Sequence, residues 1–247
     1  MKINVGLVGK GKWGKKLKKQ LDELTNLKFF YGKKNTLISD IKKEKIKWVF
    51  VATPNITHYK IVKQCIQNGV NVFCEKPLCI SYTKAKKLID YSRKKRVKLF
   101  VSDIYNYYSV KIKNLKNINY IFRSKYVGGD DNEYLFRFMY HDVSILYKFL
   151  KSNRILNFLI KNQNKKKIFE ASIELKNKIV INFIYNLNIK KKEHLLNKLV
   201  IRSEKDILKM MITNVLSNKV DFKKNNNKAL FILKFLEKLK KQAKYVY

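Results

Sequence analysis

The stretch at residues 5–14, VGLVGKGKWG, places Gly9, Gly11 and Gly14 between an apolar strand pattern and a helix pattern. In such a strand–turn–helix unit the first glycine permits a tight turn, and the second lets a pyrophosphate approach the backbone. The third lets the helix pack against the strand, and the helix N-terminus offers unpaired N–H groups to phosphates. The stretch therefore predicts a dinucleotide-binding site.

Strand and helix patterns alternate through the first hundred residues around this turn. Apolar runs predict strands at 3–8, 27–31, 47–52, 70–74 and 97–101. Amphipathic spacing predicts helices at 12–24, 57–68 and 82–95, the last of them capped by Ser81. This alternation predicts an α/β fold that begins with a Rossmann domain, a parallel sheet with helices on both faces.

The second half of the chain changes character, which places a domain boundary near residue 105. Strands are predicted at 118–126, 167–175, 178–186 and 196–203, and helices at 135–150 and 228–244. A Lys-Asn-Lys turn joins IFEASIEL to KIVINFIYNL, which is typical of an antiparallel hairpin. The segments KNQNKKK and KKNNNK are predicted to be exposed loops. We therefore expect a Rossmann domain at 1–105 and an α+β domain at 106–247.

The formal net charge of +38 is extreme for a chain of 247 residues. Lysine supplies 50 of the 56 basic residues, whereas base-edge and phosphate recognition favours the bidentate fork of arginine. Lysine, asparagine and isoleucine are residues of A/T-rich codons, so codon bias explains the charge without a selected polyanion surface. A polyanion-binding protein is the alternative, but no compact arginine–aromatic cluster supports specific nucleic-acid binding.

The cysteines and the hydropathy of the chain indicate the cellular compartment of the protein. The three cysteines, Cys65, Cys74 and Cys79, are odd in number and lack paired spacing, which is typical of reduced thiols in an intracellular protein. No second cysteine or histidine pair accompanies them, so no metal site is predicted. No apolar stretch approaches the ~20 residues of a membrane-spanning helix, and the chain begins directly with a strand pattern. We expect a soluble, cytoplasmic protein with no membrane partner.

The chain has only two prolines, and each lies in a further motif. Pro54 and Pro77 both end apolar runs. Together the segments GKGKWG, VATPNITHY and VFCEKPL resemble the Gfo/Idh/MocA family of oxidoreductases, the relatives of glucose–fructose oxidoreductase and inositol dehydrogenase. Residues 135–150 resemble the family segment that bears its active-site histidine, and residues 173–208 resemble its substrate-bearing sheet.

The resemblance implies a Rossmann domain followed by an α+β domain with an open-faced, mostly antiparallel sheet. It implies hydride transfer between NAD(P) and a hydroxyl carbon of a sugar, nucleotide sugar or cyclitol. Lys76 and His141 would be catalytic, and the substrate would contact Lys76, Tyr107, Arg123, His141 and Asp142. The coenzyme would contact Gly9, Gly11, Lys12, Trp13, Gly14, Thr53, Pro54, Asn55, His58, Glu75, Lys76 and Pro77. A cis Lys76–Pro77 bond is a further implication, and the C-terminal sheet is the surface through which a homo-oligomer would form.

The residue types suit this chemistry. Oxidising an alcohol removes the hydroxyl proton as hydride leaves, so a base with a pKa near 7 is wanted, and histidine fits unshifted. A lysine at the same hydroxyl can stabilise developing negative charge or relay the proton. Where dinucleotide sites usually carry an acid, the second strand ends in Lys33 and Lys34, which favours NADP over NAD. The general lysine excess is the competing explanation for these two residues.

Departures from the family pattern motivate a second hypothesis. The helix between the second and third strands is reduced to about 39–43, and Asp103 stands where relatives often have a histidine. Arg137 stands four residues before His141, where many relatives carry an aspartate, and Asp142 is the candidate replacement. The alternative is a catalytically degenerate family member that binds dinucleotide as a regulatory or binding protein.

Overall fold

The structure is a computed structural model in which the chain forms two compact units. It describes residues 2–32, 37–107, 120–124, 138–163, 168–176, 178–186, 193–197, 199–201, 206–242 and 244–246. The first unit combines Met1–Ile104 with Asp206–Leu233, and the second combines Tyr105–Lys205 with Lys234–Tyr247. The first unit is therefore assembled from two separate stretches of the chain.

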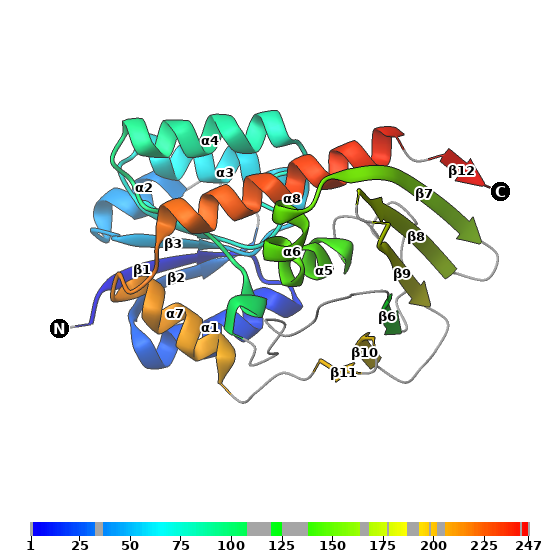
Figure 1. The fold of residues 1–247 in the computed structure, drawn as a ribbon. Helices are drawn as coiled ribbons and strands as arrows, with labels where there is room; N and C mark the ends of the chain where they lie inside the picture. Colours follow the sequence, from blue (N-terminus) through cyan, green and yellow to red (C-terminus); the bar gives the residue numbers. More distant parts are fainter. Residues whose placement is uncertain are drawn as a thin grey trace. The chain divides into compact units, whose positions relative to one another are not determined.

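The first unit is built on a parallel sheet of five short apolar strands (Figure 1). In chain order these are β1 (Asn4–Val8), β2 (Asn26–Tyr31), β3 (Trp48–Val51), β4 (Asn71–Cys74) and β5 (Leu99–Val101), arranged as β2-β1-β3-β4-β5. Phe50, Phe73 and Phe100 occupy matching positions on β3, β4 and β5, with ring centroids 4.8 and 5.2 Å apart. These rings form a continuous aromatic row through the core, and each is fully or almost fully buried.

Helices cover both faces of this sheet, which confirms the predicted doubly wound architecture (Figure 1). The helices are α1 (Lys12–Leu24), α2 (Leu37–Lys43), α3 (Asn55–Gln67), α4 (Tyr82–Lys94) and α7 (Ile207–Leu216). Helices α1 and α7 lie on one side, while α3 and α4 lie on the other. Ser81 caps α4 as predicted, since its Oγ accepts from the Lys84 N–H at 3.4 Å. The strand order reverses at β1 and β3, so ligands of such a sheet bind at the carboxyl ends of these strands.

Helix α8 (Phe222–Gln242) begins earlier than the sequence predicts, because the segment KKNNNK (223–228) is helical rather than an exposed loop. Its start is fixed by Asp221, whose Oδ1 accepts from the Lys224 N–H at 2.8 Å. Asn225 then pairs with both backbone groups of Val101, on the edge strand β5, at 2.9 Å each. Lys228 forms a 2.6 Å ion pair with Asp103, and both side chains are largely buried. The prediction failed because these polar residues find partners in the tertiary structure rather than in water.

The second unit contains a seven-stranded, mostly antiparallel sheet, as the sequence predicts. Its strands are β6 (Tyr120–Ser124), β7 (Ile155–Gln163), β8 (Ile168–Leu175), β9 (Val180–Asn186), β10 (Glu193–Leu196), β11 (Leu199–Val200) and β12 (Lys244–Val246), in the order β11-β10-β6-β9-β8-β7-β12. Helices α5 (Tyr140–Ile145) and α6 (Tyr147–Ser152) and the 3₁₀ turn η1 (Ile104–Tyr107) accompany it. The hairpin of β8 and β9 is confirmed, whereas β7, β10, β12 and α7 were not predicted.

The two faces of this sheet differ in burial along the β8–β9 hairpin. Buried and half-buried residues alternate on both strands, as expected when one face packs against a core. On β9 the buried set is Ile181, Phe183 and Tyr185. On the other face Ser172 donates to Asn182 Oδ1 at 2.7 Å, a cross-strand pair of half-buried polar residues. Along this hairpin the sheet therefore has one buried face and one half-buried, partly polar face.

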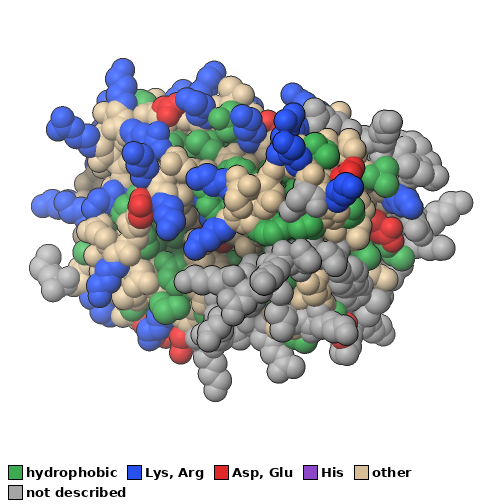
Figure 2. All heavy atoms as spheres, in the orientation of Figure 1, with side chains coloured by type: hydrophobic (Ala, Val, Ile, Leu, Met, Phe, Trp, Pro, Cys, Tyr) green, Lys and Arg blue, Asp and Glu red, His purple; other side chains and the backbone are tan. Residues whose placement is uncertain are grey.

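Basic side chains are scattered over the visible surface rather than gathered into a stripe (Figure 2). Exposed lysines occur on α1, α3, α4 and α8 alike. This distribution agrees with the codon-bias interpretation of the net charge. In the described part of the chain, no helix is both long and apolar enough to cross a membrane.

Candidate functional site

The glycine turn between β1 and α1 is shaped by close backbone approach. Gly9 has φ +122°, and a Cβ on it would lie 2.3 Å from the carbonyl oxygen of Ala52. A Cβ on Gly14 would lie 1.7 Å from the carbonyl oxygen of Gly9. Neither position can carry a side chain, because the backbone atoms themselves block it. Gly11 differs, since nothing lies within 4 Å of its Cβ position, and this space is open to a ligand.

The N-terminus of α1 is left without a protein partner for its first amides. Gly11 is the N-cap and provides no side-chain hydrogen bond, and the first turn contains no acidic residue. Lys12 and Trp13 follow in that turn. A helix end of this kind has free N–H groups and a partial positive charge, which suits a phosphate group. The turn therefore fits the pyrophosphate of a dinucleotide.

The turn after β3 supplies the second wall of the site. Pro54 is the N-cap of α3 and again offers no side-chain cap. The Thr57 hydroxyl donates to the Pro54 carbonyl at 2.7 Å and lies 2.7 Å from the Thr53 hydroxyl. Asn55 begins the helix and is half-buried. These contacts fix Thr53, Pro54 and Asn55 at the carboxyl end of β3, beside the glycine turn.

His58 ties two turns of the site together rather than facing a ligand. The ring is fully buried, with Nδ1 2.8 Å from the Pro77 carbonyl oxygen and Nε2 2.8 Å from the Thr53 carbonyl oxygen. Burial lowers the pKa of His58, and the two carbonyl contacts oppose that shift. A neutral imidazole has one N–H, so it donates to one of these carbonyls at a time. The sequence predicted a coenzyme contact for His58, and this geometry gives it a supporting role behind the contact surface.

The segment Glu75-Lys76-Pro77 follows β4 at the same edge of the sheet, and the Lys76–Pro77 bond is cis, as expected. The Glu75 N–H donates to the Val51 carbonyl at 2.8 Å, which holds the start of this turn against β3. Lys76 is half-buried and Pro77 is buried. The lysine therefore projects from a backbone segment that is fixed on both sides.

Glu75 is a buried acid with an unusual environment. Its side chain is 6% exposed, and Oε1 has no hydrogen-bond partner. Burial raises the pKa of Glu75 to about 7, although hydrogen bonds from Trp13 and Ser102 and the nearby charge of Lys76 lower it. An unpaired buried oxygen is costly unless a ligand or a proton satisfies it. The site therefore contains an acceptor without a protein donor, beside the first turn of α1.

A second cluster of polar side chains lies in the second unit, around Asp142 on α5. Asp142 is fully buried, and its Oδ2 accepts from the Tyr185 hydroxyl at 2.7 Å. Its Oδ1 lies 2.8 Å from His194 Nε2. Asp142 on α5 thus contacts His194 on β10 and Tyr185 on β9.

Two histidines flank one tyrosine in the same cluster. The ring centroid of Tyr105, in η1, lies 4.8 Å from that of His141 and 5.8 Å from that of His194. Tyr107, at the end of η1, is half-buried. Arg123 is on β6, where it pairs in register with His194. Arg137, Lys33 and Lys34 lie outside the described residues.

Sequence reasoning missed three members of this cluster: Tyr105, Tyr185 and His194. His194 stands alone in the lysine-rich run KKEHLLNK, and the two tyrosines are among the 15 in the chain. Scarcity was the one available signal for His194, because the chain has only three histidines. Its partner Asp142 is 52 positions away, so no local pattern connects them.

The described residues provide neither a metal cluster nor a reactive thiol. Among them, no group of three or more His, Cys, Asp or Glu side chains could hold a metal ion. Cys65, Cys74 and Cys79 are free and buried. Burial raises the pKa values of the Cys65 and Cys79 thiols to about 12, so both stay protonated at neutral pH.

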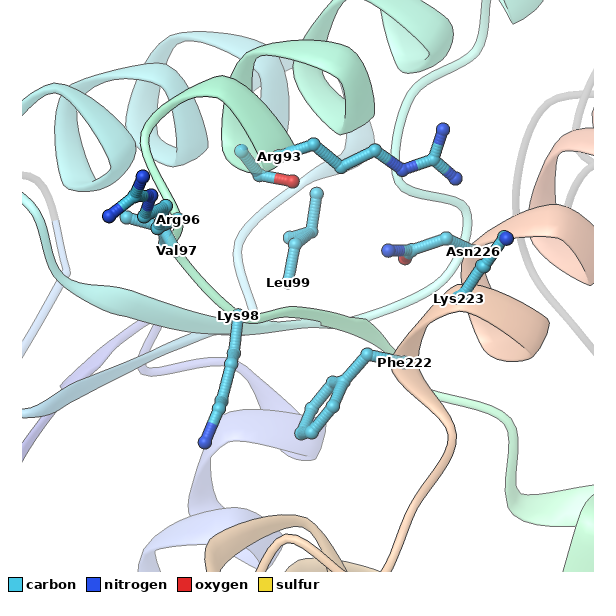
Figure 3. Close-up of a pocket in the computed structure, with 9 residues that line it drawn as sticks. Arg93, Arg96, Val97, Lys98, Leu99, Phe222, Lys223 and Asn226 are labelled. Atoms are coloured by element: carbon cyan, nitrogen blue, oxygen red, sulfur yellow. The ribbon is translucent and has the colours of Figure 1, made fainter.

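A pocket of about 540 Å³ lies at the opposite end of β5 from the glycine turn (Figure 3). It is lined by basic residues and by Phe222, but Arg96 and Lys98 point away from each other. Lys98 Nζ already donates to Asn218 Oδ1 at 2.6 Å. Without converging donors this pocket gives no argument for a catalytic or coenzyme site.

Comparison with known proteins agrees with the geometry of the first unit. Residues 19–103 match a family described as "Oxidoreductase family, NAD-binding Rossmann fold". An uncharacterized oxidoreductase of Streptococcus pneumoniae is 33% identical over 69 residues, which cover 28% of this chain and 19% of that protein. The chain thus matches about a fifth of that curated relative's length.

Solved structures extend the likeness of fold over the whole chain. UDP-N-acetylglucosamine 3-dehydrogenase from Acidithiobacillus ferrooxidans has a TM-score of 0.73 at 13% identity, covering 97% of both chains. A mutant 3-ketoreductase from Actinomadura kijaniata, solved with TDP-benzene and NADP, has a TM-score of 0.74 at 11% identity, covering 100% of this chain and 99% of that one. At these identities the likeness concerns the fold alone.

Proposed function

Because residues 19–103 match the Gfo/Idh/MocA family of oxidoreductases with an NAD-binding Rossmann fold, we propose that the chain is an NAD(P)-dependent oxidoreductase of that family. It transfers hydride between the nicotinamide and a hydroxyl-bearing carbon of a sugar-like molecule. The observation that carries this proposal is the uncapped N-terminus of α1. It faces open space at Gly11, next to a buried Glu75 oxygen that lacks a donor.

The residues of the first unit would hold the coenzyme. The amides at Gly11, Lys12 and Trp13 would bind the pyrophosphate, and Thr53, Pro54 and Asn55 would line its path along the sheet edge. Glu75 offers an acceptor for an N–H or O–H group of the ligand. When bound, the coenzyme supplies the hydride acceptor or donor, while the protein positions the reacting carbon.

Lys76 and His141 carry the proposed proton chemistry. The ammonium of Lys76 would stabilise the negative charge that develops on the substrate oxygen. The turn after β4 fixes the backbone of Lys76 and so helps to position this ammonium. His141 would take or give the hydroxyl proton, a role for which an imidazole needs no large pKa shift. Tyr107, Arg123 and Asp142 remain proposed substrate contacts, of which Asp142 would act through the side chains it holds.

The proposed substrate class is a sugar, nucleotide sugar or cyclitol. The UDP-N-acetylglucosamine 3-dehydrogenase, which shares this fold, is named for chemistry on a nucleotide sugar. NADP is bound in the mutant 3-ketoreductase with this fold, while the matched family is described as NAD-binding. We favour NADP, on the argument from Lys33 and Lys34.

The deciding experiment is a fluorescence titration of the full-length protein with NADH and NADPH. We expect saturable binding of at least one of them below about 100 μM, with a larger affinity for NADPH. Gly11→Val should weaken binding at least tenfold, because its side chain would fill the space that the pyrophosphate needs. Lys94→Val, at an exposed position in the last turn of α4 and away from the glycine turn, is the control.

Turnover is then tested with UDP-N-acetylglucosamine, myo-inositol and D-xylose in the presence of the coenzyme that binds. Lys76→Ala and His141→Ala should each lower kcat by a factor of about 10² or more. Absence of binding to either coenzyme at high micromolar concentration would refute the proposal. Tight binding without turnover of any sugar would instead favour the catalytically degenerate alternative.

A further inference from the structure

The pocket in Figure 3 contains residues of a kind that is rare in this chain. Lysine supplies 50 of the 56 basic residues, which leaves six arginines, and two of these six, Arg93 and Arg96, line the pocket. Codon bias explains the lysine excess, but it does not explain why arginines gather at one place. A guanidinium binds a phosphate through two parallel hydrogen bonds, whereas an ammonium acts as a point charge. The lining of this pocket therefore suits an anionic ligand.

Unlike Arg96, Arg93 extends from α4 toward the first turns of α8 (Figure 3). Its Nη2 lies 3.3 Å from Asn227 Oδ1. Lys223, Asn226 and Asn227 share one face of α8, because residues three and four positions apart are neighbours on a helix. Arg93, Lys223 and Asn226 all line the pocket and all belong to the first unit. Their side chains therefore surround the part of the pocket between α4 and α8.

Asn226 supplies a buried amide to this part of the pocket. It is 4% exposed, its Oδ1 has no hydrogen-bond partner, and its amide points from α8 into the pocket (Figure 3). The preceding residue, Asn225, is satisfied instead by both backbone groups of Val101 at 2.9 Å each. A buried polar atom without a partner costs free energy. A ligand that binds the amide of Asn226 would recover part of this cost.

The two cations beside this amide are open to a ligand. Lys223 is exposed and has neither an ion pair nor a hydrogen bond to its side chain among the described residues. The side chain of Arg93 is 48% exposed, and its contacts are long, 3.3 Å to Asn227 Oδ1 and 3.7 Å to Asp90 Oδ1. Lys223 also lies in the first turn of α8, which contains no acidic residue and where the helix dipole attracts negative charge.

The aromatic ring of the lining is not a platform for a nucleotide base. Phe222 packs against Trp48 and Phe100 at centroid distances of 6.1 and 6.4 Å, and Lys98 Nζ lies over its ring at 5.9 Å. Proteins commonly stack bases on an open aromatic face, which this ring lacks. A polyhydroxy ligand needs no such face.

We propose that this pocket is a binding site for a sugar phosphate, separate from the coenzyme site. Arg93 and Lys223 bind the phosphate, and the amide of Asn226 binds a phosphate oxygen or an adjacent hydroxyl group, since an amide both donates and accepts. A volume of about 540 Å³ is larger than a bare phosphate needs, and buried Val97 and Leu99 provide an apolar wall for the carbon skeleton. The site lies at the amino end of β5, whereas the coenzyme is proposed at the carboxyl ends of the strands.

Calorimetric titration of the full-length protein with glucose 6-phosphate tests the site, in about 0.15 M sodium chloride to screen the general surface charge. We expect saturable binding with a Kd below about 1 mM, binding of inorganic phosphate at least about tenfold weaker, and no detectable binding of glucose. Arg93→Gln should weaken the binding of glucose 6-phosphate at least about tenfold. Arg154→Gln, at an exposed arginine of the second unit, is the matched control, because it removes the same charge outside the pocket.

Asn226→Ala tests the buried amide separately from folding. It should weaken the binding of glucose 6-phosphate at least about fivefold. The Tm of the ligand-free protein should change by less than about 3 °C, because Asn226 Oδ1 has no protein partner to lose. Unchanged affinity in this variant would contradict the role of the amide.

Gly11→Val separates this site from the glycine turn, which also suits a phosphate, and should leave the affinity for glucose 6-phosphate unchanged. A loss of binding in Gly11→Val would place the ligand at the glycine turn and overturn the proposal. Equal losses in Arg93→Gln and Arg154→Gln would show attraction by net charge alone and overturn it too, as would undetectable binding to the wild type. Coenzyme binding is measured in its own titration, so neither result decides the other.

Discussion

Glu75 shows how one residue can be retained at a cost to stability. Its carboxyl is buried against Trp13 and Ser102, and its pKa is raised to about 7 by burial. Between pH 4.5 and about 7 the folded protein therefore binds the proton that the unfolded chain releases. The free energy of unfolding must fall as the pH rises through this window. A residue that destabilises the protein at neutral pH is one that function explains better than folding.

Glu75→Gln should remove this pH dependence. At pH 8 the variant should be more stable than the wild type, by up to about 3 kcal/mol, because the amide cannot ionise. At pH 5 the two proteins should differ little. Urea unfolding at both pH values measures the difference, and Glu44→Gln, at a half-buried acid outside the site, serves as the control. An equal difference at pH 5 and pH 8 would contradict the assignment.

The site was predictable from the sequence where rare residues carried it. Gly9, Gly11 and Gly14 stand out in a glycine-poor chain, and Pro77 marks the Glu75-Lys76 turn in a chain with two prolines. His194 could not be found in this way, because the contact that places it in the cluster is with Asp142, which lies on a helix far away in the sequence. A local pattern records spacing along one element, whereas this pair joins a helix to a strand.

At the scale of elements, a side chain of α8 covers part of the edge of the first sheet. Asn225 binds both the N–H and the C=O of Val101, so a side-chain amide takes the place of a sixth strand at the edge β5. Phe222 adds a ring 6.1 Å from Trp48 and 6.4 Å from Phe100. At Val101 the edge strand therefore has no backbone group left to pair with another chain.

Asn225→Ala should therefore destabilise the protein by about 3 kcal/mol, because two buried backbone groups lose their partners. Asn227→Ala, two positions along the same helix, should cost less than about 0.5 kcal/mol, since Asn227 is exposed and makes one 3.3 Å contact with Arg93. Urea unfolding of both variants gives the comparison. Equal losses for the two would show that the amide of Asn225 is not what secures the edge.

Elements were predicted well where hydrophobic periodicity was local. The bounds of α1 agree with the prediction at both ends, and the five strands of the first sheet were all found. The segment 223–228 was misread because its asparagines and lysines have no apolar face. Its helical structure follows from Asp221 at the start and from Val101 and Asp103 across the unit. Composition alone could not reveal these partners.

At the scale of the whole molecule, the net charge of +38 disfavours the folded state. Like charges spread over the surface repel one another in the compact state more than in the unfolded chain. Salt screens this repulsion, as the Debye length falls from about 10 Å at 0.1 M to about 3 Å at 1 M. The scattered positive charges also attract any polyanion weakly, without base specificity.

Thermal stability should consequently rise with sodium chloride. We expect the Tm to increase by at least about 3 °C between 0.05 and 0.5 M, the effect of about 1 kcal/mol in a chain of this size. The variant Lys60→Glu/Lys87→Glu, at two exposed positions, should show a smaller increase. Calorimetry at several salt concentrations measures both. A Tm that is constant or falls with salt would show that surface repulsion is not a significant term.

The first unit is formed from two separate stretches of the chain, so the ribosome synthesises its parts at different times. The sheet residues are complete when Val101 leaves the ribosome, but the aromatic and amide cover of β5 arrives only with Phe222 and Asn225. At roughly 5–20 residues per second the ribosome needs about 6–25 seconds to deliver it. For that interval the nascent chain exposes an open strand edge, which is a binding surface for chaperones. We expect the first unit to complete its fold only once Asn225 has been synthesised.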